Sequence, residues 1–323
     1  NEGTDLGADV QLIASEVHAK VPSEVQMTGA FIVSQTNGSS QGGNVTVTAD
    51  RVTMEQGSGI FPGAGGAGAA GNVSIQGTKD AGGVATSVTL LGGSMIANST
   101  FGSGTSGEIS IKANSLTLDG FSSTLKSTTN GSGPNGPIVV SVGNATLSNQ
   151  ATFESSTANG AGTVGGKITV QGLQGEGSRA ESLILEGPGT GIISGAFVGQ
   201  ASLGDIEVHA KTVSLMDGAV IQAGTPTDQV TAGDIKIDAS NVGLSGGSLI
   251  ASQAFGFDAG TVSITADQQF SLNQSSIETN TGSPIGGQGG SVVLNVGSAS
   301  LTNGATITSS STGTGNAGNI TIN

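Results

Sequence analysis

The groups best suited to chemistry in this sequence are a histidine, two carboxylates and a lysine, which form two pairs one repeat length apart. Glu207 and His209 are followed 29 residues later by Lys236 and Asp238, so a repeating fold would bring the two pairs together. General acid–base catalysis needs such groups within hydrogen-bond reach of one substrate. Glu207 beside Lys236 is more typical of a salt-bridge ladder, and a lone histidine at an outward position is usually solvated. We therefore interpret His209 as an exposed surface residue.

Carboxylates at outward positions are expected to be isolated from one another, for instance Glu108, Glu154, Glu207 and Glu278. A glycosidase needs two carboxylates at a fixed separation, and the sequence does not set such a pair apart. The absence of Trp and Tyr also removes the usual stacking platforms for sugar rings. The sequence therefore predicts no catalytic residue.

A metal site is the other chemistry to consider. Asp205, Asp234 and Asp238 are acids that stacked repeats could bring near one another. Calcium needs several oxygens that converge on one point, and the glycine-aspartate nonapeptide of calcium-binding β-rolls is missing. The sequence predicts no metal site and no cofactor, although an acidic surface that collects divalent cations stays an alternative.

The element that must position these residues is a short motif, a glycine followed by two alternating aliphatics, which occurs eleven times. Self-similarity at a period of about 20 to 50 residues is typical of solenoids, propellers and arrays. The motif starts at Gly7, Gly43, Gly71, Gly107, Gly136, Gly166, Gly204, Gly233, Gly260, Gly290 and Gly318.

Each repeat contains three segments in which apolar residues alternate with polar ones, and such alternation predicts strands. The first segment is typified by Ile235 and Ile237, and the second by Val213 and Leu215. The third follows a small, large, small pattern, as in Ala151, Phe153 and Ser155. Glycine, Asn, Ser and Asp, which adopt turns easily, separate the segments.

Three strands per repeat, each above its counterpart, predict an all-β parallel β-helix with about ten to eleven coils. We expect one domain over residues 1–323 without a linker, forming a rod about 50 Å long at one strand spacing per coil. A propeller needs four antiparallel strands in each blade, and leucine-rich repeats need a helical or asparagine-ladder signature. Neither pattern is present.

The composition indicates the surroundings of this rod. The chain has 57 Gly, no Cys and a formal charge of −14, with 23 acidic and 9 basic residues. An acidic rod repels nucleic acid and anionic lipid, because both are bound through Lys and Arg. No apolar run approaches 18 residues, so we expect no membrane span. The first residues, NEGTDLGADVQL, do not resemble a signal peptide.

Two surface features are candidates for binding. If the small and large positions of the third segment face inward, an apolar stripe faces outward, and such a stripe marks either a partner site or the seat of a covering loop. The stripe comprises Phe31, Val33, Phe61, Met95, Ile192, Val220 and Leu249. The second feature is a set of three longer repeats, whose insertions at 15–24, 76–87 and 171–182 should leave the rod at one corner. Insertions of this kind either form a binding face or reflect tolerated length variation.

The amino-acid sequence of the repeats resembles that of a known family. The segments GNVTVTAD (43–50), GDIKIDASNVGLSGGSLIASQ (233–253) and SASLTNGATITSSSTGTGNAGNITI (298–322) are similar to the filamentous-haemagglutinin-type repeats of two-partner-secretion exoproteins, above all cyanobacterial surface proteins. This resemblance covers nearly the whole chain. It implies a right-handed β-helix, export through an outer-membrane partner, and a role in adhesion, aggregation or surface structure. The Asn-Pro-rich secretion motifs of that family are absent.

The sequence therefore predicts a non-enzymatic extracellular rod on a bacterial cell surface, a segment of an adhesin or fibre-forming protein. The alternatives are a polysaccharide-active β-helix enzyme (lyase or hydrolase) and a tail-fibre module. The last motif, at Gly318, opens a new coil, so we expect either a segment of a longer shaft or head-to-tail self-association into filaments, and we favour an open, assembling end. The surface ligand cannot be named from the sequence.

Overall fold

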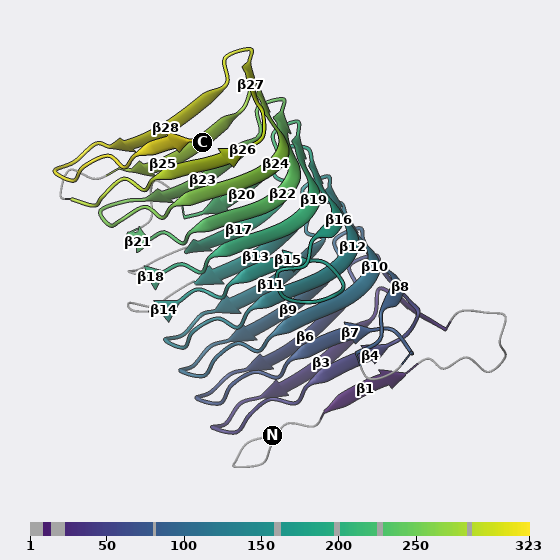
Figure 1. Cartoon of the computed structure of the whole chain (residues 1–323). Helices are drawn as coiled ribbons and strands as arrows, with labels where there is room; N and C mark the ends of the chain where they lie inside the picture. The colour runs from purple at the N-terminus through teal and green to yellow at the C-terminus, as the bar shows by residue number, and fades with distance from the viewer. Residues whose placement is uncertain are drawn as a thin grey trace.

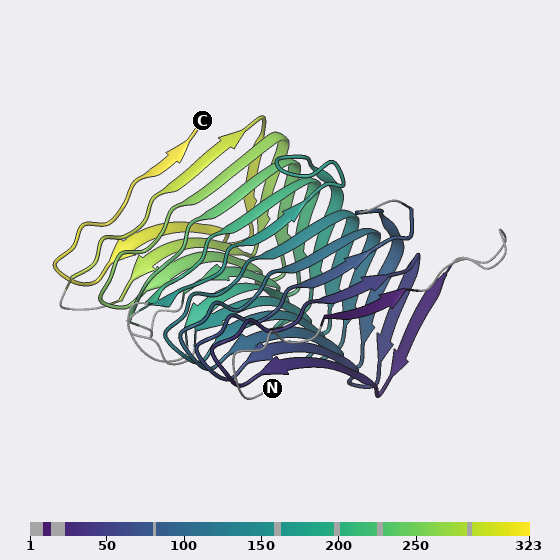
Figure 2. The same ribbon diagram turned by 90° about the horizontal axis from the view of Figure 1, so that it is seen from below.

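The computed structural model describes residues 9–13, 23–79, 82–157, 163–196, 201–224, 229–282 and 286–323. In these residues the strands pair in parallel and stack coil upon coil, and there is no helix. The fold is a β-solenoid of about ten turns, which confirms the predicted parallel β-helix. Figures 1 and 2 show the coils one above another, with the N-terminal strands at one end of the rod and the C-terminal strands at the other.

The described strands form three sheets. The large sheet holds the first and second segments of the repeats: β1 (Val10–Ile13), β2 (Glu24–Thr28), β4 (Val45–Thr48), β5 (Arg51–Glu55), β7 (Val73–Gln76), β8 (Ala85–Leu91), β10 (Ile109–Asp119), β12 (Ile138–Ser148), β15 (Ile168–Gln171), β16 (Ala180–Glu186), β19 (Ile206–Met216), β22 (Ile235–Ser245), β24 (Val262–Asn273), β26 (Val292–Val296), β27 (Ala299–Thr302) and β29 (Ile320–Ile322). The second sheet holds the third segments: β3 (Phe31–Thr36), β6 (Gly59–Ala64), β9 (Met95–Thr100), β11 (Thr124–Thr129), β13 (Thr152–Thr157), β17 (Gly191–Ala196), β20 (Val220–Ala223), β23 (Leu249–Ala254), β25 (Ser276–Thr281) and β28 (Thr306–Ser311). The small sheet holds β14 (Thr163–Val164), β18 (Ala201–Ser202) and β21 (Val230–Thr231).

The first and second segments are joined more closely than the sequence predicts. In β10, β12, β19, β22 and β24 they form one continuous strand of 11 or 12 residues. The strand bends by placing two outward residues in succession: Ala113 is buried, Asn114 and Ser115 face outward, and Leu116 is buried again. A coil without an insertion therefore turns this corner without leaving the sheet.

The inward residues form continuous aliphatic ladders along the rod. The alternating aliphatics of the first segments are buried, as predicted. Of the residues beside them, Lys236 is exposed, and Ser110, Lys112 and Asp238 are half-buried. The register confirms the stacking, because Ile109 pairs with Ile138 and Ile235 with Val262. The buried residues of the first segments include Ile109, Ile111, Ile235, Ile237, Val262 and Ile264.

The glycine that starts each coil is required by the close approach of neighbouring coils. A Cβ atom built on Gly107 would lie 2.2 Å from the carbonyl oxygen of Gly71, and one on Gly260 would lie 2.3 Å from that of Gly233. Real side chains do not tolerate such contacts with backbone. The glycine of the motif is thus selected by coil-to-coil packing.

The last small residue of the third segment connects two sides of the narrow core. Ser252 on β23 accepts a hydrogen bond from the backbone N–H of Gly260 at 2.8 Å and donates one to the carbonyl of Gly233 at 2.9 Å. Ser155 accepts from Gly166 in the same way at 2.9 Å, and Asn98 donates to Gly71 at 2.6 Å. Buried backbone groups at the start of a coil need such partners, which explains the small polar residue.

The insertions at 76–87 and 171–182 leave the rod at the same corner, as predicted. The first connects β7 to β8 and the second connects β15 to β16, and both lie between the first and second segments. Most of the insertion at 15–24, and residues 80–81 of the insertion at 76–87, lie outside the described residues. Gly172 and Ser178 close the insertion at 171–182 with a backbone hydrogen bond of 2.7 Å.

Candidate functional site

The largest assembly of charged side chains in the described residues lies on the outer face of the large sheet. We call it the charged cluster. Four successive coils and one insertion build it, with the side chains in outward positions of neighbouring strands. Its members are Lys167, Arg179, Glu207, His209, Lys236, Asp238 and Asp267.

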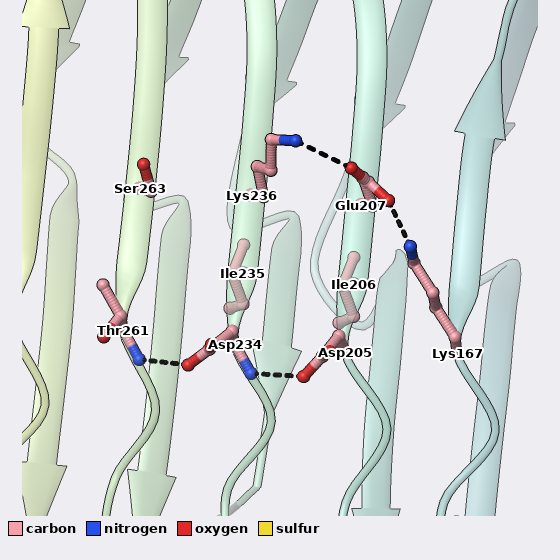
Figure 3. A pocket seen from close by; sticks show the side chains of 9 residues that line it. All are labelled: Lys167, Asp205, Ile206, Glu207, Asp234, Ile235, Lys236, Thr261 and Ser263. Carbon is pink, nitrogen blue, oxygen red and sulfur yellow. Dashed lines mark hydrogen bonds and ion pairs between the residues drawn. The ribbon is translucent and has the colours of Figure 1, made fainter. Parts of the chain in front are cut away.

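Glu207 on β19 is the centre of one half of the cluster. Figure 3 shows its carboxylate between two lysines, Lys167 from the preceding coil and Lys236 from the following one. Lys236 Nζ lies 3.0 Å from Glu207 Oε1, which confirms the predicted ladder. The hydrogen bond from Lys167, helped by the one from Lys236, lowers the pKa of Glu207 to about 2 despite the partial burial of the carboxylate. Glu207 is therefore ionised at neutral pH.

His209 lies at the junction between the two halves. Its Nε2 is 3.1 Å from Glu207 Oε1, and its Nδ1 is 3.4 Å from Asp238 Oδ2 on β22. The residue is only 6% exposed, so the prediction of a solvated surface histidine is wrong. The physical reason is that carboxylates from its own coil and from the next coil enclose the ring on both sides.

Arg179 forms the other half and comes from the insertion at 171–182. Its Nη2 and Nε lie 2.5 Å and 3.0 Å from the two oxygens of Asp238, and its Nη1 lies 2.5 Å from Asp267 Oδ2. Such a two-pronged contact is the strong geometry for an arginine and a carboxylate. It lowers the pKa of Asp238 and raises that of Arg179. The insertion is thereby fixed to strands β22 and β24.

A second row of acids runs parallel to the lysines, as the lower part of Figure 3 shows. Asp205 Oδ1 accepts the backbone N–H of Asp234 at 2.8 Å, and Asp234 Oδ1 accepts that of Thr261 at 2.7 Å. These two aspartates lie on adjacent coils, as expected. A shallow depression of about 240 Å³ lies between the two rows.

The chemistry of the cluster is that of an ion-pair network. The carboxylates of Glu207 and Asp238 have lowered pKa values, so neither holds a proton that it could give to a leaving group at neutral pH. The described residues contain no group of three or more His, Cys, Asp or Glu side chains arranged to hold a metal ion. Lys126 and Glu154 on the second sheet form a further pair at 2.8 Å. Glu154 and Glu207 thus pair with lysines and not with each other.

The apolar stripe lies on the second sheet, away from the charged cluster. Phe31 and Val33 on β3 are 62% and 52% exposed, and the rings of Phe31 and Phe61 stack with centroids 6.0 Å apart. The insertion at 171–182 binds the large sheet through Arg179. It therefore does not fold over the stripe, which lies on the second sheet. The half-buried members of the stripe are Phe61, Met95, Val220 and Leu249.

One predicted member of the stripe is wrongly placed. Ile192 on β17 is completely buried, because it pairs with Phe153 and Ile221 of the inward ladder. The outward residue of this coil is Ile193, which pairs with Glu154. The stripe is therefore strongest over the N-terminal coils.

The main feature that sequence reasoning missed is the contact of Arg179 with Asp238 and Asp267, which are 59 and 88 residues away. The only signal was the concentration of charge in the insertion at 171–182, which contains Glu176, Arg179 and Glu181. The direction in which the insertion leans along the rod has no signature in the repeat pattern.

In the part of the chain that the structure describes, no helix has the length and apolar character needed to cross a membrane. Comparisons of the chain with protein-family models, with curated proteins and with solved structures found no match.

Proposed function

We propose that this chain is a non-enzymatic structural rod, a segment of an adhesin or fibre-forming protein on the outer surface of a bacterial cell. The observation that carries the proposal is the way the polar side chains are used. The charged and acidic side chains bond mainly from one coil to the next along the rod, as in the ladder of Asp205, Asp234 and Thr261. Such use stabilises a long shaft.

The exposed apolar stripe supports an adhesive role for the same rod. Soluble monomers seldom expose contiguous apolar patches without a partner, and Phe31, Val33 and Phe61 lie together on β3 and β6. Head-to-tail association is part of the proposal. Ile320 and Ile322 on the edge strand β29 are about half exposed, and a further coil, from the same chain or from a second copy, would cover them.

Immunogold labelling of intact source cells, with antibodies raised against the purified chain, tests the location and shape together. We expect label on the outer surface of unpermeabilised cells and rods or filaments in negatively stained extracts. Label that appears only after the cells are permeabilised would contradict the surface role.

One observation favours the alternative of a polysaccharide-active enzyme. His209 contacts both Glu207 and Asp238 on the outer face of a parallel β-helix. The purified chain should therefore be incubated with neutral and uronic-acid polysaccharides and assayed for new reducing ends and for unsaturated uronates. Activity that is lost in His209→Gln would replace the structural proposal with the enzymatic one.

A further inference from the structure

A glycine in the middle of a strand marks a surface cavity that the fold does not require. Gly243 lies on β22 between Val242 and Leu244, which are both buried, so its missing side chain would point outward. Its φ is not positive, and a Cβ atom built there would meet nothing within 4 Å. Unlike the glycines at the coil starts, this one has no conformational or packing reason to be glycine.

The same position carries a side chain in the other described coils that pair along this row. Glycine inside a strand weakens it and often marks a place where a ligand approaches the backbone. Gly243 therefore leaves a gap in a row of outward side chains. In order along the rod, the row is Gln26, Thr53, Thr89, Thr117, Thr146, Ile184, Ser214, Gly243, Ser271 and Ser300.

The gap is the floor of a cavity of about 300 Å³, which we call the Gly243 notch. Uncharged polar side chains in two rows on three successive coils surround it, at one coil spacing of about 4.8 Å. The first row pairs Thr212 with Asn241 and Gln269, and the second pairs Ser214 with Gly243 and Ser271.

The polar groups of the notch are available to a ligand. Among the described residues, no protein group bonds the side chains of Thr212, Ser214, Gln269 or Ser271, and Asn241 donates one hydrogen bond of 3.3 Å to Gln268. In contrast, the carboxylates and lysines of the neighbouring charged cluster are paired with one another. The notch is thus an uncharged, hydrogen-bonding hollow on an otherwise acidic rod.

We propose that the Gly243 notch binds a neutral sugar residue of a glycan. Hydroxyl and amide groups both donate and accept hydrogen bonds, as sugar hydroxyls do. The absence of a side chain at Gly243 lets the ring approach the strand, and the volume lies within the usual range for small-ligand sites, about 300 to 1,000 Å³. The proposal rests on the surface role proposed above, because a glycan is a ligand that an extracellular rod meets.

Filling the notch is the test, because the fold tolerates it. Gly243→Thr places in the gap a residue type that the same row already holds at Thr146, and removing a strand glycine should leave stability equal or higher. Ser300→Thr enlarges the same row two coils away and is the matched control. Gln269→Ala removes one polar group from the notch without filling it.

The purified chain and its variants are applied to an array of neutral gluco-, galacto- and mannooligosaccharides, with uronic-acid oligosaccharides as contrast. The strongest neutral binder is then titrated calorimetrically. We expect at least about tenfold weaker binding in Gly243→Thr and a smaller loss in Gln269→Ala, with Ser300→Thr like the wild type. Binding that persists in a folded Gly243→Thr variant would overturn the notch and leave the adhesive rod supported. A wild-type chain that binds no neutral glycan also overturns the notch, whereas the surface labelling decides the rod separately.

Discussion

Glu207 shows at the scale of one residue how this rod uses charge. Its carboxylate is shared by Lys167, Lys236 and His209, so it ties together three successive coils. An ion pair on an exposed surface contributes little, but Glu207 is half-buried and makes several bonds at once. Its ionised form is therefore part of the folded structure.

This arrangement predicts a pH dependence of stability. The pKa of Glu207 is lowered from 4.5 to about 2, so its contribution is fully present above pH 4.5 and is lost as the pH falls towards 2. Glu207→Gln should lower the free energy of unfolding by about 1–2 kcal/mol at pH 7. The difference from the wild type should shrink between pH 4.5 and 2.

Urea unfolding at a series of pH values measures this difference. Glu186→Gln, at an exposed carboxylate of β16, is the control and should change stability little at any pH. A difference for Glu207→Gln that stays constant down to pH 2 would contradict the assignment.

The inward ladder predicts a larger effect at Ile237. Ile237→Asp puts an unpaired carboxylate into an aliphatic interior and should cost several kcal/mol, on the order of 3–5. Ser110→Asp, at a half-buried outward position of β10, should cost less than about 1 kcal/mol. Thermal unfolding followed by circular dichroism compares the two, and an unchanged melting temperature in Ile237→Asp would show that the register is wrong.

The alternation of the sequence predicts which residues face inward, except where two registers fit equally well. Gly191, Ile192, Ile193 and Ser194 allow either isoleucine to be the large residue between two small ones. Pairing of Ile192 with Phe153 decides between them. Local sequence could not, because the choice depends on a residue 39 positions away.

At the scale of elements, the insertion at 171–182 acts as a strap along the large sheet. It leaves the rod after β15, and Arg179 then reaches two strands that lie further along the rod, β22 and β24. The same insertion also pairs Glu181 with Lys211 of β19 at 2.7 Å, with both side chains more than half exposed. The contacts of Arg179 should contribute much more to the free energy of unfolding than the Glu181–Lys211 pair does.

Arg179→Gln should release the strap. We expect about 1–2 kcal/mol lower stability and faster amide hydrogen exchange within 171–182, because the partly buried Asp238 and the exposed Asp267 both lose their partner. Lys211→Gln removes only the exposed pair and should change stability by less than about 0.5 kcal/mol. Equal effects of the two variants on exchange would argue against a strap held by Arg179.

The hydrogen bonds that Ser252 makes across the core give a separate prediction. Ser252→Ala leaves the backbone N–H of Gly260 and the carbonyl of Gly233 without their side-chain partner in a buried place. The cost should be about 1–3 kcal/mol. Ser110→Ala, on the outer face, should be nearly neutral, and denaturant unfolding of the two variants provides the comparison. A neutral Ser252→Ala would mean that water replaces the hydroxyl.

The repeat pattern predicts the strands well and the corners only in part. The sequence predicts a turn at Asn114 and Ser115, between two strands. In the structure they lie within one bent strand, because β12 pairs with β10 on both sides of the bend. The small sheet at Thr163, Ala201 and Val230 has no clear alternation, since its strands are only two residues long. Pairing between coils, which propensity does not encode, creates both features.

At the scale of the whole molecule, the apolar and charged surfaces occupy different sheets. The exposed part of the stripe lies over β3 and β6, and the charged cluster lies over the large sheet. This separation allows a rod to be held by one face while another stays solvated. The fold itself was predictable because eleven copies of one motif leave few architectures; the strap was not, because it joins residues 88 positions apart.

The stripe yields a prediction for adhesion. Phe31→Ser combined with Phe61→Ser should reduce attachment of the purified chain to cells or apolar surfaces severalfold, because it removes the two stacked rings of the stripe. Phe121→Ser removes an equally large ring that is 72% exposed outside the stripe, and it should attach like the wild type. Surface plasmon resonance measures the attachment of both variants. Equal loss of attachment in both would indicate nonspecific hydrophobic adsorption instead of binding through the stripe.

The direction of the backbone hydrogen bonds has a mechanical consequence. They run along the rod from coil to coil, so a pull on its ends loads one coil at a time. Ile109 and Ile138 occupy the same place in successive coils, 29 residues apart. A coil therefore adds about 4.8 Å to the folded rod but releases about 100 Å of chain when it is peeled away. Under tension the rod would lengthen about twentyfold before it breaks. Unravelling should pause at Arg179, because its ion pairs with Asp238 and Asp267 hold several coils together.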